Sequence, residues 1–212
     1  MKVLIINPNS DVEMTKAIDE SARNFVKDRF ILETVSLGDS PAFVGSYEDI
    51  AMVGKGLVEC IKRNQDKYDA FVIACHLDPN LDAAKEVTNK LVIGIGEASM
   101  KMASLLGRNF SVIGSSNKTT HLKKELATKY GLKKYLNSVR TPDESAQNFT
   151  LEEKLIFAAK KAVEEDKAEI LVLGCAGFAG IDKSIEKIVK VKVLDGIVCA
   201  LMMAEGMDNY QN

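Results

Sequence analysis

The chain has 212 residues, of which 46% are hydrophobic and 27% are charged, and its net charge is −2. This is an ordinary globular composition, with enough apolar residues for one large or two small cores. The low net charge and the pI near 5.8 argue against the basic patches that bind nucleic acid or anionic membranes. Apolar runs are too short for a membrane span, and the apolar start is too short for a signal peptide. We therefore expect a cytoplasmic protein that acts on a small-molecule substrate.

Short apolar runs alternate with helix-like stretches along the whole chain. The expected strands are 2–6, 30–36, 69–74, 91–95, 109–114, 135–139, 169–173 and 191–194, and the expected helices are 10–28, 47–66, 80–89, 97–106, 118–130, 150–166, 180–189 and 196–208. Every residue of the run 71–74 is apolar, which is typical of a strand buried on both faces of a parallel sheet. The alternation predicts an α/β fold with right-handed crossovers.

An internal repeat relates the two halves of the chain. Residues 66–75 and 166–175 each consist of a polar lead-in, an apolar run and a cysteine where the run ends, at an offset of 100 residues. Upstream, residues 2–9 resemble residues 110–117 at an offset of 108, so the first half carries extra residues, which we place in the loop 38–46.

The repeat and the elements together predict two pseudosymmetric lobes. Each lobe is expected to hold a mostly parallel sheet of roughly four strands flanked by helices, with the active site between the lobes. We expect the first lobe to comprise residues 1–96 and about 196–212, and the second lobe to comprise residues 97–195.

The two repeated cysteines, Cys75 and Cys175, are the candidate catalytic pair. Both follow strands, at the edge of the sheet where parallel α/β folds bind ligands. Two opposed acid/base groups are what a racemase needs, because one removes a proton from one face of a carbon and the other returns a proton to the opposite face. A helix N-terminus after each cysteine is expected to lower the pKa of its thiol. Cys60 and Cys199 have no repeat partners and are interpreted as small buried hydrophobes.

Other residues at the same strand ends are candidates for holding the oxygens of a substrate. His76 has no chemical twin, because its repeat mate is an alanine. The lysine pairs at 123–124 and 133–134 are interpreted as solvent-exposed surface. The expected substrate-binding residues are Asn7, His76, Ser115, Ser116, Ala176, Gly177 and Phe178.

Signatures of other enzyme classes are missing from the sequence. Ser99 replaces the third glycine of a dinucleotide-binding fingerprint that would begin at Gly94, and no P-loop motif is present. The cysteine spacing does not fit a zinc site, and two histidines are too few for most His-rich metal sites. We therefore expect no metal.

Short motifs spread over the chain carry a family resemblance. They lie at residues 6–10, 74–79, 94–98, 110–113, 138–140, 173–177 and 195–196. Together they resemble the aspartate/glutamate/hydantoin racemase superfamily, and within it the hydantoin and allantoin racemase branch. The resemblance implies two α/β lobes, an interlobe active site, no cofactor, and Cys75 and Cys175 as the acid/base pair. The chain departs from the family pattern at His76, Ser115 and Phe178, which we expect to line the pocket.

We expect a cofactor-independent racemase or epimerase that acts on a hydantoin or allantoin-type ureide, whose relatively acidic ring C–H suits a cysteine base. None of the residues expected to face the cleft is Arg or Lys, so no clamp for a second carboxylate is predicted. An aspartate/glutamate-type racemase is the alternative within the superfamily. A ligand-binding or redox protein with a disulfide across the cleft is the alternative from another class. We also expect a homo-oligomer.

Overall fold

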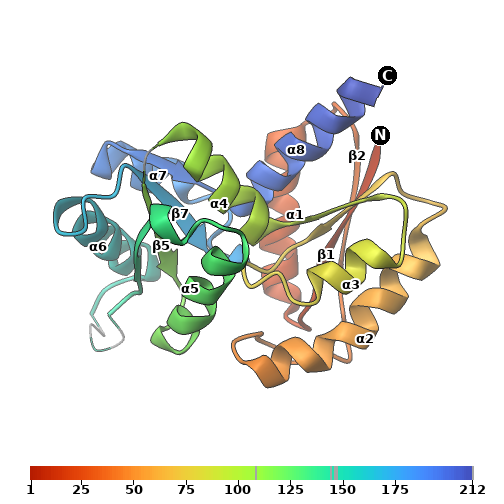
Figure 1. Cartoon of the computed structure of the whole chain (residues 1–212), viewed down its shortest axis with the longest axis horizontal. Coiled ribbons are helices and arrows are strands. Elements are labelled where there is room, and N and C mark those ends of the chain that lie inside the picture. The colour runs from red at the N-terminus through yellow and green to blue at the C-terminus, as the bar shows by residue number, and fades with distance from the viewer. Residues whose placement is uncertain (108, 144, 146–147, 212) are drawn as a thin grey trace.

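The computed structural model describes residues 1–107, 109–143, 145 and 148–211, which form two α/β lobes that lie side by side (Figure 1). Each lobe holds a four-stranded sheet, and every paired strand in both sheets runs parallel to its neighbour. The strand orders are β2-β1-β3-β4 and β6-β5-β7-β8, so the two sheets have the same topology. The predicted fold is confirmed, and the repeat in the sequence corresponds to a repeat in the architecture.

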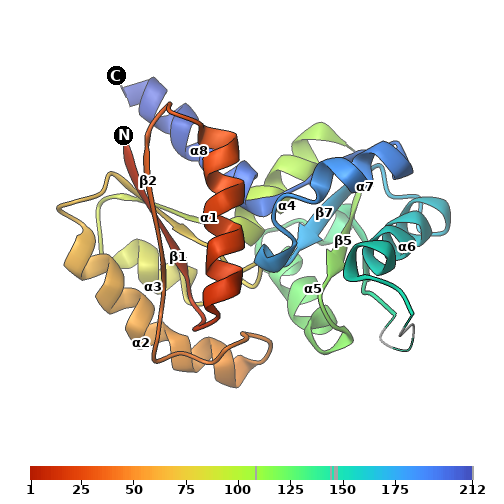
Figure 2. The same cartoon turned by 180° about the vertical axis from the view of Figure 1, so that it is seen from behind.

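The first sheet is covered by helices on both faces. Its strands are β1 (Lys2–Asn7), β2 (Ile31–Ser36), β3 (Ala70–Ile73) and β4 (Leu91–Gly94). Helices α1 (Val12–Val26) and α8 (Gly196–Gln211) pack on one face, where Figure 2 shows them side by side, and α2 (Tyr47–Asn64) and α3 (Leu81–Glu86) pack on the other. All four residues of β3 are buried, which explains why its sequence is apolar without alternation.

The second sheet repeats this arrangement. Its strands are β5 (Phe110–Gly114), β6 (Leu136–Arg140), β7 (Ile170–Gly174) and β8 (Lys192–Leu194). Helices α6 (Leu151–Glu164) and α7 (Asp182–Val189) cover one face, and α4 (Ile95–Leu106) and α5 (Thr120–Lys129) cover the other. Three short 3-10 helices lie at η1 (Asn117–Thr119), η2 (Lys133–Tyr135) and η3 (Ala176–Phe178).

Each half of the chain lends its last helix to the other lobe. Met100 and Ala103 of α4 are buried with Phe110 and Val112 of the second sheet. At the other end of the chain, α8 places four of its residues in the core of the first lobe, namely Ile197, Ala200, Leu201 and Ala204. We therefore propose the lobe boundaries that the sequence predicts, with residues 1–96 and about 196–212 in one lobe and 97–195 in the other.

No helix in the described part of the chain is both long enough and apolar enough to cross a membrane.

Candidate active site

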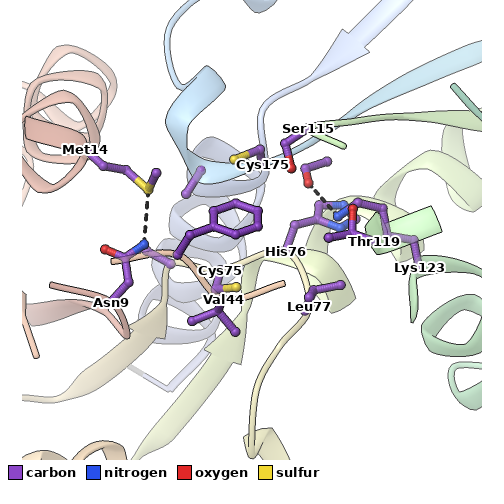
Figure 3. Close-up of a pocket in the computed structure, with 14 residues that line it drawn as sticks. Asn9, Met14, Val44, Cys75, His76, Leu77, Ser115, Thr119, Lys123 and Cys175 are labelled. Carbon is purple, nitrogen blue, oxygen red and sulfur yellow. Dashed lines mark hydrogen bonds between the residues drawn. The ribbon is translucent and has the colours of Figure 1, made fainter. Parts of the chain in front are cut away.

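A small open cavity, with free space of about 20 Å³ for a water-sized molecule, lies between the lobes beyond the C-terminal ends of β1, β3, β5 and β7 (Figure 3). The first lobe and the second lobe both contribute to its wall. The lining residues are Asn9, Met14, Phe43, Val44, Ala74, Cys75, His76, Leu77, Ser115, Thr119, Lys123, Gly174, Cys175 and Ala176. This position is where parallel α/β sheets usually bind ligands.

The two repeated cysteines face this cavity from opposite lobes. Cys75 lies two residues beyond β3, Cys175 lies directly after β7, and both are free thiols that are half-buried. Burial raises the pKa of Cys75 to about 12, against a smaller lowering effect of the Leu77 N–H. Burial also raises the pKa of Cys175, against smaller lowering effects that include the Gly177 N–H.

The expectation of thiols with lowered pKa values is therefore corrected. The backbone N–H groups and the charge of Lys123 act in the expected direction, but the loss of water around the sulfurs is larger. A long helix N-terminus is also missing at both sites, because a turn follows Cys75 and only the 3-10 helix η3 follows Cys175. Short turns supply a few N–H donors and little helix dipole.

Lys123 is the principal site residue that the sequence analysis missed. It lies on α5, its side chain is 2% exposed, and its Nζ donates a hydrogen bond to the Gly174 carbonyl oxygen (2.7 Å; Figure 3). The interpretation of Lys123 as surface is wrong, whereas its neighbour Lys124 is exposed as predicted. A signal existed, because positions 119, 122, 123, 126 and 127 have the spacing of a buried helix stripe and all five are buried.

His76 lines the cavity as a neutral imidazole. It is 1% exposed, and burial and the nearby Lys123 charge lower its pKa well below the ordinary value. Ser99 Oγ donates to the Ile95 carbonyl oxygen (2.6 Å) and lies 3.4 Å from His76 Nε2. Ser99 is thus left to accept, which places the ring proton on Nε2. Nδ1 is then an acceptor, and it has no partner among the described residues.

Comparison with known proteins identifies the family of this chain. Residues 3–204 match the Asp/Glu/Hydantoin racemase family. The chain belongs to this family. A hydantoin racemase of Pseudomonas sp. (strain NS671) is 39% identical over 211 residues, which cover 97% of this chain and 85% of the relative. A hydantoin racemase of Paenarthrobacter aurescens is 33% identical, with 98% and 91% of the two chains covered.

A solved structure extends the comparison to the fold. The allantoin racemase from Klebsiella pneumoniae superposes with a TM-score of 0.93 at 28% identity, over 100% of this chain and 89% of that chain. The predicted family and the predicted enzyme class are confirmed: the protein is a racemase, and therefore an isomerase.

The structure of this racemase distributes the expected substrate-binding residues unevenly. His76, Ser115 and Ala176 line the cavity. Phe178 does not, because its side chain is 5% exposed and packs in the core of the second lobe. Ser116 and Gly177 lie just outside the lining. The Ser116 hydroxyl accepts a hydrogen bond from the Lys118 N–H (3.3 Å) at the start of η1.

Asn7 is also outside the lining, and its neighbour Asn9 takes the place expected for it. Asn7 is fully buried, and its Nδ2 donates to Asn9 Oδ1 (2.7 Å) and Thr15 Oγ1 (2.9 Å). These bonds hold the turn between β1 and α1. Asn9 in turn donates from Nδ2 to the Met14 sulfur (3.3 Å), and both residues face the cavity (Figure 3). Strand alternation alone does not say which asparagine of the turn points to the ligand.

The loop 38–46 supplies part of the cavity wall through Phe43 and Val44. The repeat comparison marked this loop as extra residues of the first half, without assigning it a role. Its two apolar side chains cover the site on the first-lobe side. The expectation that the extra residues of the first half lie in this loop is wrong, because ten residues separate β2 from α2 and ten also separate β6 from α6. The first half is longer in its helices instead, with 15 residues in α1 against 10 in α5 and 18 in α2 against 14 in α6.

Proposed function

We propose that this racemase inverts the stereocentre of a five-membered ureide ring, such as a 5-substituted hydantoin or allantoin, by a two-base mechanism with Cys75 and Cys175. One cysteine, as the thiolate, takes the proton from the ring carbon next to a carbonyl. The other, as the thiol, returns a proton to the opposite face. No cofactor takes part in this scheme.

The observation that carries the mechanism is the pairing of the thiols. They occupy matching positions of the repeat, and they line one cavity from opposite lobes. Groups that approach one ligand from opposite sides have the geometry that inversion requires. A single base on one side could exchange the proton but would return it to the same face.

The charges of the cavity wall support a ring substrate over a free amino acid. Among the described residues, the lining holds one cationic side chain, Lys123, and no Asp or Glu. This Lys corrects the expectation that no cation faces the cleft. A free amino acid brings an ammonium group and, for aspartate or glutamate, two carboxylates, and the ammonium would have no acidic partner here. A ureide ring presents only carbonyl and N–H groups.

The neutral His76 offers a hydrogen-bond acceptor to the N–H groups of a ureide ring. Its Nδ1 is a buried acceptor that meets no donor in the described part of the chain, and a buried polar atom of this kind costs free energy until a donor reaches it. We infer that a ring N–H of the substrate donates to Nδ1, while Ser115 and the Lys123 ammonium are placed to donate to ring carbonyls. Alternating donors and acceptors are the pattern of a ureide edge.

Polarimetry on a substrate panel tests the proposal. Single enantiomers of a 5-substituted hydantoin, allantoin, aspartate and glutamate are incubated at equal concentration, with the Cys75→Ser/Cys175→Ser double variant as the control for spontaneous racemisation. We expect enzyme-dependent loss of rotation with a ring compound and little with the amino acids. In heavy water, the inverted product should carry one deuterium at the stereocentre. Rapid loss of rotation with L-aspartate or L-glutamate alone would overturn the substrate assignment and leave the two-base mechanism standing.

The cellular location and the assembly state remain predictions from the sequence. Light scattering coupled to size-exclusion chromatography measures the assembly state, and we expect a mass of at least twice the 23.2 kDa of one chain.

A further inference from the structure

The side chain of Lys123 runs through a path that the fold keeps open for it. Gly114, the last residue of β5, lies beneath the aliphatic stem, where an added Cβ would be 3.1 Å from Lys123 Cε. The stem crosses the end of β5, and the Nζ reaches the last carbonyl of β7, at Gly174. β5 and β7 both end in a glycine, and the buried ammonium lies at these two strand ends.

The ammonium forms no direct ion pair with a carboxylate of the described residues, although the Asp78 charge acts on it from farther away. Among the residues that the structure describes, no carboxylate lies within 4.0 Å of its Nζ. An ammonium carries three N–H donors, and the Gly174 carbonyl uses one. A buried cation that is not paired is costly, and its retention calls for an anion that the resting protein does not display.

We propose that Lys123 is the fixed countercharge for the negative charge that moves between Cys75, the substrate and Cys175 during racemisation. This proposal rests on the two-cysteine function given above. The Lys123 side chain lines the same cavity as both sulfurs, and its ammonium is held still by the Gly174 carbonyl.

The movement of charge explains why one cation serves both cysteines. When the Cys75 thiolate takes the proton, the electron pair of the C–H bond forms the C=C bond of an enolate, the π pair of the carbonyl moves to its oxygen, and Cys75 becomes a thiol. When the enolate carbon takes the proton of the Cys175 thiol, that sulfur becomes the thiolate. A single negative charge passes through three places, and the fixed ammonium, whose charge acts on both sulfurs, stabilises it without reorganisation.

The charged and titratable groups around Lys123 come from both lobes. The two sulfurs and Asp78 raise the pKa of Lys123, against the larger lowering effect of burial. In return, Lys123 lowers the pKa values of both cysteines and of His76. Removal of the cation should therefore raise the thiol pKa values of both cysteines, and not of one alone.

Alkylation of the resting enzyme tests this without any substrate. Iodoacetamide labelling of Cys75 and Cys175 is followed by peptide mass mapping as a function of pH in wild type, Lys123→Met and Lys124→Met. In Lys123→Met, both sites should need a pH about one unit higher for the same rate, or label about tenfold more slowly at fixed pH. Lys124→Met, which alters the exposed neighbour, should match wild type, and kcat should fall in Lys123→Met only.

A second variant keeps the test decisive if Lys123→Met does not fold. Gly114→Ala places a methyl group 3.1 Å from Lys123 Cε, so the end of the lysine stem must shift by a few tenths of an ångström while the charge is kept. Its labelling curves should shift in the same direction. Curves that coincide with wild type in a folded variant, or a shift confined to one cysteine, would overturn the proposal. Labelling needs no turnover, so it tests the role of Lys123 without assuming the two-base mechanism. The cysteine variants test that mechanism separately.

Discussion

At the scale of single residues, the site combines two thiols that are hard to ionise with one buried cation. Burial raises the pKa values of both cysteines, and the Lys123 charge and backbone N–H groups offset part of that rise. A thiol with a raised pKa is the stronger base once ionised, which suits the abstraction of a weakly acidic carbon proton.

The first prediction concerns the division of labour between the thiols. Cys75→Ser and Cys175→Ser should each reduce kcat for racemisation by about a thousandfold, because only one face of the carbon is then served. Each variant should still exchange the proton of one enantiomer, with opposite preferences, which proton NMR in heavy water measures. Racemisation at nearly the wild-type rate in either variant would rule out the two-base mechanism.

The second prediction concerns pH. With the pKa of Cys75 near 12 and that of Cys175 also raised, both sites are mainly thiols at neutral pH. The thiolate fraction then rises about tenfold per pH unit, so kcat/KM should rise steadily between about pH 6 and pH 8. Initial rates corrected with the double cysteine variant measure this. A plateau below pH 7 would mean that the working thiol has a lowered pKa.

At the scale of elements, Asp78 ties the turn after Cys75 to helix α4. Its carboxylate accepts hydrogen bonds from the N–H groups of Gly96 (2.9 Å) and Glu97 (2.6 Å), and from the Tyr130 hydroxyl (2.6 Å) at the end of α5. The turn that carries Cys75 is thereby fixed to two helices that cover the second sheet.

The third prediction follows from the burial of Asp78. Burial raises its pKa to about 7, above the value of about 3.9 in an unfolded chain. The folded state therefore binds more protons between these values, and this group's contribution to the free energy of unfolding falls as pH rises from about 4 to about 7. The stability difference between wild type and Asp78→Asn, from urea unfolding, should shrink over that range. A difference that grows with pH would show that Asp78 is ionised throughout.

The fourth prediction concerns the crossing of α4 and α8 between the lobes. An added Cβ at Gly196 would lie 3.0 Å from the Ile95 carbonyl oxygen, so Gly196→Ala should lower the free energy of unfolding by about 1–3 kcal/mol. Gly206 is the matched control, since it lies in the same helix with nothing within 4 Å. Gly206→Ala should raise stability by about 0.5–1 kcal/mol. Equal effects of the two variants would show that the crossing is loose.

At the scale of the whole molecule, the exchange of α4 and α8 makes each lobe depend on the other half of the chain. Neither half carries all the helices that cover its own sheet. The candidate active site also depends on both lobes, because residues of both lobes line its cavity.

The fifth prediction is that the two lobes unfold together. Far-UV circular dichroism in urea should show one transition, because loss of either sheet removes a helix from the other. The alkylation of Cys199, which is buried in the first-lobe core on α8, should have the same midpoint. Two separated transitions would mean that the lobes are independent in spite of the exchanged helices.

Much of this architecture was determined by the sequence alone. All eight strands and all eight helices lie where the apolar runs and helical stretches predict them, within a few residues at their ends. Local chemistry decides these features, because a strand buried on both faces must be apolar throughout and a repeat in sequence folds into a repeat in space. Cys75 and Cys175 could be chosen for the same reason, since a matched pair at two strand ends is visible in the order of residues.

Only the tertiary structure decided the surroundings of the two thiols. Whether Lys123 faces water or the cavity depends on the Gly174 carbonyl, which lies 51 residues away in sequence, and on the gap above Gly114. Asn9 rather than Asn7 faces the cavity because of bonds within one turn, and Phe178 turns into the core. The pKa values of the thiols follow from burial between two lobes, which no single segment reveals. Desolvation depends on everything that surrounds a group, and only the folded chain brings those surroundings together.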